Sequence, residues 1–491
     1  MNKLRDKFLL MCIFTVCASS AVLAESYRAG VALYKVVLAK PGATPQELIE
    51  SNLNQYVKLI DSVKNKVDIV VFPEYGLTTL TPITSLKEHL KTYSTIVEAV
   101  GTQICNQSST RILPRLACAA KANNQYVIVN LLENDNNDYY ITNVCLDPSG
   151  SICLRCRKRH LYRETPFSAP PADDKACVFD AKINAATVTF SVLFDTDMLY
   201  EIPKELKHDN IIMTTSIVNS LPLEFGLSLE AGFSVGNDVN LLVSGFWDAK
   251  NNYGGSGIYH RNGTSVVGMS AEGVPDALNG STILIEQMQL KPRDSRKVNF
   301  EAKPYGTIQP QNVNYKKIEG LGDMNKTVSE KCLNDNSLCC KFKAEVDQES
   351  IAPYRWVAIS NKTTILNQTV DVFICALVKP TDGAKPIKFQ KVSISSNLRK
   401  SEAVQSLPIA LRKDFVPASF VYEEADAGTS ITLNEEAELL MFGIVQVMPH
   451  KKSPSSNTAL IVVIVLLVLV VLAVGGFLIW RKRQRKNRSA L

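Results

Sequence analysis

The chain has 491 residues, of which 46% are hydrophobic, and it carries a formal net charge of +6. It is too long for one ordinary domain and apolar enough for a large core, so two globular units are expected. The six basic residues of the run RKRQRKNR, which starts at residue 481, account for the whole net charge. The rest of the chain is near neutral, and nothing in it indicates nucleic-acid binding.

Both ends of the chain resemble targeting segments. Residues 1–24 begin with basic residues, continue with a short apolar run and end in the small residues AVLA, which is typical of a cleaved secretory signal peptide. Residues 459–480 form an unbroken apolar segment long enough to cross a bilayer, and the basic tail 481–491 follows directly. This order predicts a single-pass type I protein of the cell membrane, with an extracellular or lumenal ectodomain and a cytoplasmic tail.

Strand and helix patterns alternate over residues 25–300, which predicts a layered α/β domain. TPQELIESNLNQYVKLIDSVKNK has helical spacing and a Thr44 cap, VDIVVFPEYG is a buried strand, and LPRLACAAKANN is a helix. YYITNVCLDPSGSICLRCRKRHL is a hairpin about DPSG, ATVTFSVLFD is a strand, and a further helix is expected to start at Pro222. Residues 301–450 read as a smaller β-rich domain, and 451–458 as a polar linker.

The cysteines and glycosylation sequons fit an oxidising compartment. Of the 12 cysteines an even number remains once Cys12 and Cys17 of the signal segment are set aside, so disulfides are the default. The candidates are two near neighbours and a second-domain group: Cys105, Cys118, Cys332, Cys339, Cys340 and Cys375. The N-x-S/T sequons begin at Asn106, Asn262, Asn279, Asn325, Asn361 and Asn367. One isolated CxxC, CLRC, is weak support for zinc, so no metal site is predicted.

Charged residues stand at the ends of several predicted strands. Glu74 ends a buried strand and Lys158 ends a hairpin strand, positions where α/β sheets place their sites. VLFDTDML resembles the motif of haloacid dehalogenase phosphatases, with Asp195 as nucleophile and Asp197 as acid. Leu199 departs from that motif, and no paired acidic motif follows it. The phosphatase interpretation is therefore a remote alternative.

Several segments, in this order, resemble the vanin and biotinidase branch of the carbon–nitrogen hydrolase (nitrilase) superfamily. They are FPEYG, LACAAKANNQYVIVNL, RKRHLYRETPF, VNSLPLEF, DVNLLVSGFW and GGSGIY, followed by CLNDNSLCCKF and VDVFICALV in the second domain. The resemblance implies an αββα four-layer sandwich with a vanin-type C-terminal β-rich domain, and hydrolysis of pantetheine- or biotin-like amides without a cofactor. It also implies that Glu74 is the general base, that Lys158 stabilises the tetrahedral intermediate, and that a cysteine attacks the carbonyl.

The resemblance breaks at the cysteine. In the ungapped frame its position falls on Asp195, and in a shifted frame it falls on Leu193. Tyr75 and Ile217, the latter in place of a tryptophan of vanins, are the expected substrate contacts. A carboxylate attacking an amide would form an anhydride, a poorer intermediate than a thioester. We therefore expect a catalytically silent protein that binds a small amide-like ligand or a partner.

An active amidase with a displaced nucleophile is the alternative. Cys156 precedes Lys158 by two residues, so in a strand both side chains point to the same face. The more ordinary expectation for Cys156 is a disulfide with Cys145, Cys153 or Cys177. The sequence does not predict an oligomeric state.

Overall fold

The computed structural model describes the chain between residues 26 and 448 with short gaps. The gaps fall at 39, 81–86, 108–110, 163, 172, 185, 201, 203, 291–294, 307, 309–313, 317–326, 334–337, 348–350, 366–367, 380–386 and 400–404. The predicted signal peptide and membrane segment lie outside the described residues. No helix in the described part is long and apolar enough to cross a membrane.

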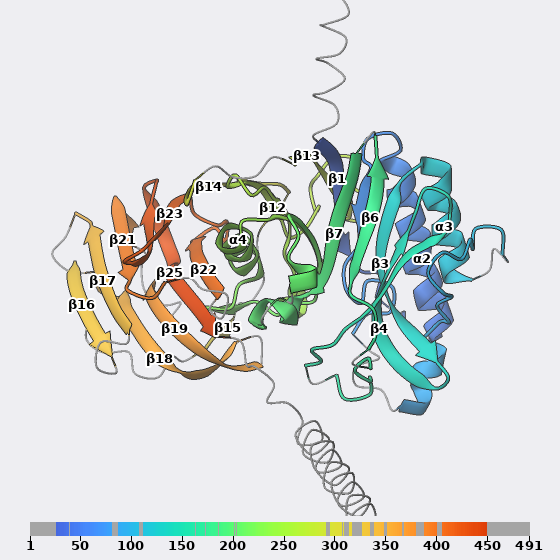
Figure 1. Cartoon of the computed structure of the whole chain (residues 1–491), viewed down its shortest axis with the longest axis horizontal. Coiled ribbons are helices and arrows are strands. Elements are labelled where there is room, and N and C mark those ends of the chain that lie inside the picture. The colour runs from blue at the N-terminus through green and yellow to red at the C-terminus, as the bar shows by residue number, and fades with distance from the viewer. Residues whose placement is uncertain are drawn as a thin grey trace, which may run out of the picture. The chain divides into compact units, whose positions relative to one another are not determined.

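The first sheet has the strand order β13-β1-β2-β3-β4-β5, with β1, β2 and β3 parallel. Its strands are β1 (Ser26–Lys35), β2 (Ile69–Val71), β3 (Tyr126–Asp135), β4 (Asp138–Leu146), β5 (Ile152–Arg157) and β13 (Thr282–Gln289). Helices α2 (Pro45–Ser62) and α3 (Ile112–Asn123) cover its outer face (Figure 1). Thr44 and Glu47 form a capping box at the start of α2, which satisfies two backbone N–H groups and confirms the predicted cap. A short η2 turn (Lys87–Thr92) lies between β2 and α3.

The second sheet packs against the first and has the order β6-β7-β8-β10-β11-β12. Its strands are β6 (Val178–Ile183), β7 (Ala186–Phe194), β8 (Asn210–Thr215), β10 (Asn240–Trp247), β11 (Ser256–Tyr259) and β12 (Thr264–Gly268). The short turns η3 (Asp195–Leu199), η4 (Lys204–Leu206) and η5 (Ala249–Asn251) connect them. The inner faces share one core, in which Tyr27 of β1 meets Phe190 of β7 at 5.2 Å between ring centroids. Helix α4 (Gly226–Asn237) covers the outer face.

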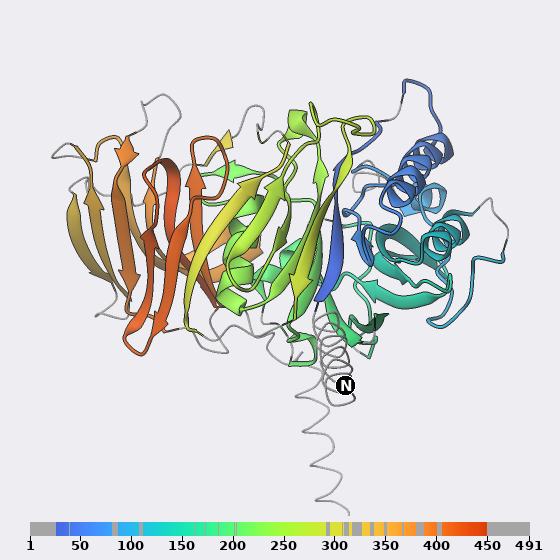
Figure 2. The same cartoon turned by 90° about the horizontal axis from the view of Figure 1, so that it is seen from above.

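The C-terminal domain is a β-sandwich, as predicted in outline, and it continues the second sheet. The first half of strand β14 (Lys297–Pro304) pairs with β23 and its second half pairs with β12. One layer is completed by β16 (Val328–Leu333), β17 (Leu338–Glu345), β21 (Lys391–Ser396), β23 (Phe420–Ala425) and β24 (Gly428–Leu433). The other contains β18 (Arg355–Ile365), β19 (Gln368–Val378), β20 (Lys388–Phe389), β22 (Gln405–Arg412) and β25 (Ala437–Met448). Figure 2 shows these layers beside α4 and away from α2 and α3.

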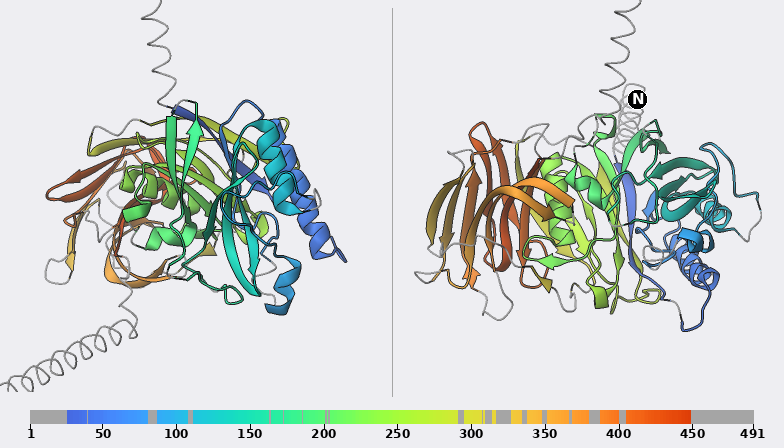
Figure 3. Two further views of the ribbon diagram at one scale, coloured as in Figure 1. Left: turned by 45° about the vertical axis from the view of Figure 1, so that its right-hand side comes forward. Right: turned by 90° about the horizontal axis from the view of Figure 1, so that it is seen from below.

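Helix α4 is both the fourth layer and the junction between the domains, as the views in Figure 3 agree. A Cβ on Gly236 would lie 1.8 Å from the backbone oxygen of Ser406, and one on Gly232 would lie 2.5 Å from that of Pro408. These glycines let the backbone of β22 lie directly against the helix, where the Ser228 hydroxyl accepts a hydrogen bond from the Ala410 N–H at 3.0 Å. One hydrophobic core therefore runs from α4 into the C-terminal domain.

The predicted start of this helix at Pro222 is wrong, because α4 begins at Gly226. Ser220 and Glu224 close a turn through two backbone hydrogen bonds. The Asn219 side chain accepts a hydrogen bond from the Gly226 N–H at 2.8 Å. This turn also carries β9 (Ser220–Leu221), which pairs with β15 (Asn314–Tyr315).

Candidate functional site

The three residues that sequence reasoning selected all follow strand ends. Glu74 comes three residues after β2, Lys158 directly follows β5, and Asp195 directly follows β7 and opens η3. β2 is parallel to β1 in the first sheet, and β7 is parallel to β8 in the second. Residues that follow the carboxyl ends of such strands can meet in a common site at one edge of the packed sheets.

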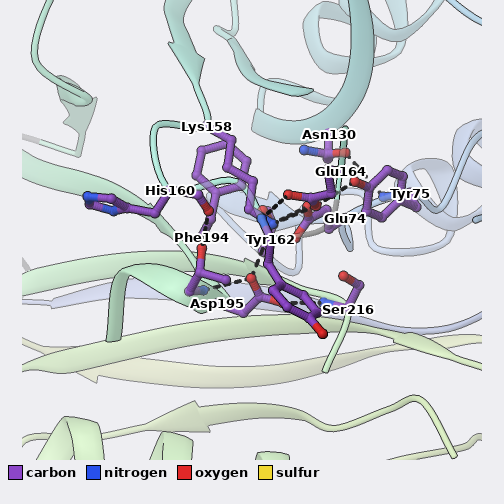
Figure 4. Close-up of polar contacts among 12 residues, drawn as sticks. Glu74, Tyr75, Asn130, Lys158, His160, Tyr162, Glu164, Phe194, Asp195 and Ser216 are labelled. Atoms are coloured by element: carbon purple, nitrogen blue, oxygen red, sulfur yellow. Dashed lines mark hydrogen bonds and ion pairs between the residues drawn. The ribbon is translucent and has the colours of Figure 1, made fainter. Parts of the chain in front are cut away.

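These side chains converge on the Lys158 ammonium. Its Nζ lies 2.9 Å from Glu74 Oε1, 3.3 Å from Asp195 Oδ1 and 3.0 Å from Glu164 Oε1 (Figure 4). All four side chains are buried. Asp195 therefore occupies the corner that the resemblance assigns to the cysteine. Leu193 instead lines a separate cavity on the far side of η3.

The backbone holds the Asp195 carboxylate in place. Its Oδ2 accepts a hydrogen bond from the Ser216 N–H at 3.1 Å, and its Oδ1 accepts one from the Thr196 N–H at 2.7 Å. With Lys158 as a third donor, both oxygens are engaged in charge-assisted contacts that stabilise the ionised carboxylate.

Burial and charge act together on the two central groups of this cluster. Burial and the neighbouring carboxylates Asp195 and Glu164 raise the pKa of Glu74 well above its usual value, against the opposing effect of Lys158. Burial alone would lower the pKa of Lys158, but its three carboxylate neighbours outweigh burial and raise that pKa well above the usual range. The arrangement thus favours a charged Lys158 and a protonated Glu74.

A cavity of about 390 Å³ opens beside the cluster. The lining includes Lys158, Glu164 and Asp195 of the cluster, together with Leu80, Tyr162, Thr196, Ser216, Ile217, Val218, Ser220, Glu224, Tyr253 and Lys316. Ile217, one of the two expected substrate contacts, lines the cavity. Tyr75 does not: it is 1% exposed, and its hydroxyl donates a hydrogen bond to Glu164 Oε1 at 2.7 Å. Tyr75 therefore lies behind the site and orients Glu164.

Glu164 is the member of the cluster that sequence reasoning missed. Beyond Lys158 and Tyr75, it accepts a hydrogen bond from the Tyr162 N–H at 2.8 Å through Oε2. The available signal was an acidic residue six positions after Lys158 inside RKRHLYRETPF, the segment that supports the family resemblance. The carboxylates surround an ammonium, and among the described residues no group of His, Cys, Asp and Glu is arranged to hold a metal ion.

The second acid of the phosphatase-like motif faces another way. Asp197 Oδ1 lies 2.6 Å from His160 Nδ1, and Asp197 Oδ2 accepts a hydrogen bond from the Phe194 N–H at 2.8 Å. Asp197 lines the separate cavity on the other side of η3. Asp195 and Asp197 therefore do not share a site, which removes the geometric basis of the phosphatase interpretation.

The cysteines from Cys105 onward all form disulfides. The pairs are Cys105–Cys118, Cys145–Cys153, Cys156–Cys177, Cys332–Cys339 and Cys340–Cys375. The predicted candidates are confirmed. Because Cys156 is bonded to Cys177, it offers no free thiol, so the displaced-nucleophile alternative lacks its proposed nucleophile.

Comparison with known proteins gives the family of both domains. The carbon–nitrogen hydrolase family matches residues 38–195, and the Vanin C-terminal domain matches residues 307–449. Vanin-like protein 3 of Drosophila melanogaster is 29% identical over 273 residues, which cover 52% of this chain and 50% of that protein.

Two further relatives have named enzyme activities. Pantetheine hydrolase VNN2 of Homo sapiens is 31% identical over 169 residues, 32% of each chain. Biotinidase of Bos taurus is 26% identical over 234 residues, 43% of this chain and 44% of that one. The matched part thus spans between about a third and half of each of these three relatives. Both domain matches and these relatives agree that the chain belongs to the vanin and biotinidase branch of the carbon–nitrogen hydrolase superfamily.

Proposed function

We propose that this protein has the site of an amide hydrolase but does not hydrolyse amides, and that it binds a small ligand in the cavity beside Lys158. The observation that carries the proposal is the position of Asp195, 3.3 Å from the Lys158 ammonium. A nucleophile in this family has to be a strong one that leaves a hydrolysable intermediate, and a thiolate meets both needs. Loss of a nucleophile that acts together with its base costs about 10⁴- to 10⁶-fold in rate.

The state of Glu74 supports the same proposal. A general base must be unprotonated at the working pH. The negative neighbour Asp195 contributes to raising the pKa of Glu74, so Asp195 both replaces the nucleophile and favours the protonated form of the base. Both oxygens of Asp195 also accept hydrogen bonds, which weakens it as a nucleophile.

The test is a hydrolysis assay of the purified ectodomain with pantetheine and with a biotinyl amide, the substrates suggested by the names of two relatives. The expected result is no turnover above buffer. Lys158→Ala and Glu74→Gln are assayed in parallel to identify any contaminating enzyme. Turnover by the native chain that disappears in both variants would show that the protein is an active amidase.

We also propose that the protein is secreted and tethered to the cell membrane through residues 459–480. The support comes from the two terminal segments, from the five disulfides, and from four exposed sequon asparagines: Asn106, Asn262, Asn279 and Asn361. Asn325 and Asn367 lie outside the described residues. Surface biotinylation of intact cells, followed by enzymatic deglycosylation, is expected to label a species that then decreases in mass. An unlabelled and unshifted chain would contradict the proposal.

A further inference from the structure

The charges that line the cavity do not balance. Among the residues that the structure describes, three carboxylates line it, those of Glu164, Asp195 and Glu224, and two ammonium groups do, those of Lys158 and Lys316. Lys316 pairs with Glu224, so this second pair is neutral by itself. The excess negative charge lies in the buried cluster, where Glu164 and Asp195 share one lysine.

A second observation concerns Glu74, the third carboxyl group around Lys158. Glu74 Oε2 is fully buried and has no hydrogen-bond partner among the residues that the structure describes. Its other oxygen contacts the same Lys158 ammonium. Because the protonated form of Glu74 is favoured, the Lys158 ammonium compensates only one of the two carboxylates Glu164 and Asp195. An uncompensated buried charge is costly, so the site is short of positive charge.

The walls of the cavity suit an organic cation. Tyr162 and Tyr253 line it together with Ile217 and Leu80. Aromatic faces attract an ammonium group by cation–π interaction, and apolar side chains bury an alkyl chain. The volume of about 390 Å³ is near the lower end for ligand pockets, so the ligand is small.

We propose that this cavity binds a small primary ammonium compound, with the ammonium group against Asp195 and the alkyl part against Ile217 and the tyrosines. The inference rests on the proposed function, because it assigns Asp195 the role of a counter-ion in place of a nucleophile. The replacement of a neutral thiol by a carboxylate adds one negative charge to a buried site, and the ligand supplies the compensating positive charge.

The experiment compares three probes of similar size on the full ectodomain: n-butylammonium, 1-butanol and butyrate. Calorimetric titration is expected to show binding of n-butylammonium, weaker or no binding of 1-butanol and no binding of butyrate. Higher salt is expected to weaken binding of the ammonium probe. Equal binding of n-butylammonium and 1-butanol, preference for butyrate, or no binding of any probe would overturn the inference.

Two substitutions with opposite expected signs separate charge from structural damage. Asp195→Asn removes one negative charge and is expected to weaken n-butylammonium binding about tenfold or more. Lys316→Gln frees the Glu224 carboxylate and is expected to tighten n-butylammonium binding. Misfolding would not produce tighter binding. Asp426→Asn, at a side chain that is 94% exposed, is the matched control and is expected to leave affinity unchanged. Weaker binding in Lys316→Gln would contradict the charge assignment.

The same preparation tells failure of this inference from failure of the proposed function. If the native chain hydrolyses the amide substrates, then the pseudoenzyme proposal fails. If the native chain does not hydrolyse them and binds 1-butanol or butyrate better than n-butylammonium, then only the ligand class is wrong and the proposed binding function stands.

Discussion

Two ion clusters adjoin the end of β5, and their charge balance differs. In one, Arg155 and Arg157 face Glu133 and Asp135, two cations for two carboxylates. In the other, the single ammonium of Lys158 faces Glu74, Glu164 and Asp195. The neighbouring residues Arg157 and Lys158 thus belong to a balanced and an unbalanced cluster respectively.

The difference also appears in the protonation of the buried glutamates. Burial alone would raise the pKa of Glu133, but hydrogen bonds from Arg157, Arg155 and Thr142 outweigh burial and hold that pKa below its usual value. For Glu74, burial prevails and the pKa is raised. A balanced cluster serves to hold two strands together, whereas an unbalanced one keeps a protonated carboxyl and an excess negative charge beside a cavity. The number of cations per carboxylate therefore decides, at buried positions, whether burial or ion pairing sets the pKa of the glutamate.

Restoring a thiol in the unbalanced cluster is the largest expected effect. Asp195→Cys removes the excess charge and recreates the Glu, Lys and Cys set of the family on a scaffold that still holds Lys158 and Glu74. Hydrolysis of a pantetheine or biotinyl amide is expected to rise at least about 10²- to 10³-fold above the level of Asp195→Ser, the size-matched control. Labelling by a thiol-reactive amide analogue is the second measurement.

A folded, monodisperse Asp195→Cys protein with neither activity nor labelling would show that the cavity has diverged beyond the nucleophile. Ile217 is then the first residue to change, because it lines the cavity where vanins carry a tryptophan. Activity in Asp195→Ser equal to that in Asp195→Cys would contradict the role of the thiol.

Glu230 extends the comparison to a buried carboxyl with no ion pair among the described residues. It accepts a hydrogen bond from the Tyr259 hydroxyl at 2.8 Å, and burial raises its pKa to about 8. The pKa of Glu230 is higher in the folded chain than in the unfolded chain, so protonation of Glu230 stabilises the fold. This contribution is complete below about pH 4.5 and is lost as the pH rises toward about 8. At about 1.4 kcal/mol per pKa unit, the loss between pH 5 and pH 8 is on the order of 4 kcal/mol.

The measurement is the free energy of unfolding of the ectodomain by denaturant at pH 5, 6.5 and 8. Glu230→Gln is expected to flatten the decline, while the exposed control Asp426→Asn leaves it unchanged. The pKa of Glu74 is also raised, so a smaller decline of the free energy of unfolding with pH is expected to persist in Glu230→Gln. The lowered pKa of Glu133 acts only below about pH 4.5 and does not contribute in this range. Identical slopes for Glu230→Gln and the native chain would show that Glu230 does not titrate in the window.

A matched pair of carboxylate-to-amide changes tests the balance directly. Glu133→Gln leaves two arginines without their shared buried partner and is expected to cost about 3 kcal/mol of unfolding free energy. Asp195→Asn removes one of two like charges on a single lysine and is expected to cost less than about 1 kcal/mol. Chemical denaturation of both variants at pH 7 measures the difference. Equal costs would mean that the Lys158 cluster is also a structural ion network.

The sequence predicted those features whose causes are local. Thr44 and Glu47, three residues apart, fix the start of α2. Apolar and β-branched residues favour the strands that precede Lys158 and Asp195. The site residues were predictable because the family motifs bracket each of them. Their convergence on Lys158 was expected only from that frame, since no local pattern brings Glu74 and Lys158, 84 positions apart, into contact.

The features that the sequence did not predict depend on distant contacts. Glu164 stands in a loop without periodicity, and its hydroxyl donor Tyr75 lies 89 positions away. Proline is common in the first turn of a helix, but no helix begins at Pro222. The Asn219 side chain donates a hydrogen bond to the backbone oxygen of Asn252, 33 positions away, and so holds the segment before α4 in a turn. The continuation of one sheet through β14 into the second domain likewise depends on strand pairing that a local pattern does not record.

The smallest expected effects come from the neutral hydroxyl donors of the two clusters. Tyr75 donates to Glu164 Oε1 at 2.7 Å, and Thr142 donates to Glu133 Oε2, also at 2.7 Å. When its hydroxyl donor is lost, Glu133 keeps two arginine partners. Among the described residues, Glu164 then keeps a shared lysine and one backbone N–H. Tyr75→Phe is therefore expected to cost about 2 kcal/mol of unfolding free energy, and Thr142→Val about 1 kcal/mol. Denaturant unfolding at pH 7 measures both costs, and a larger cost for Thr142→Val would reverse the order that charge balance predicts.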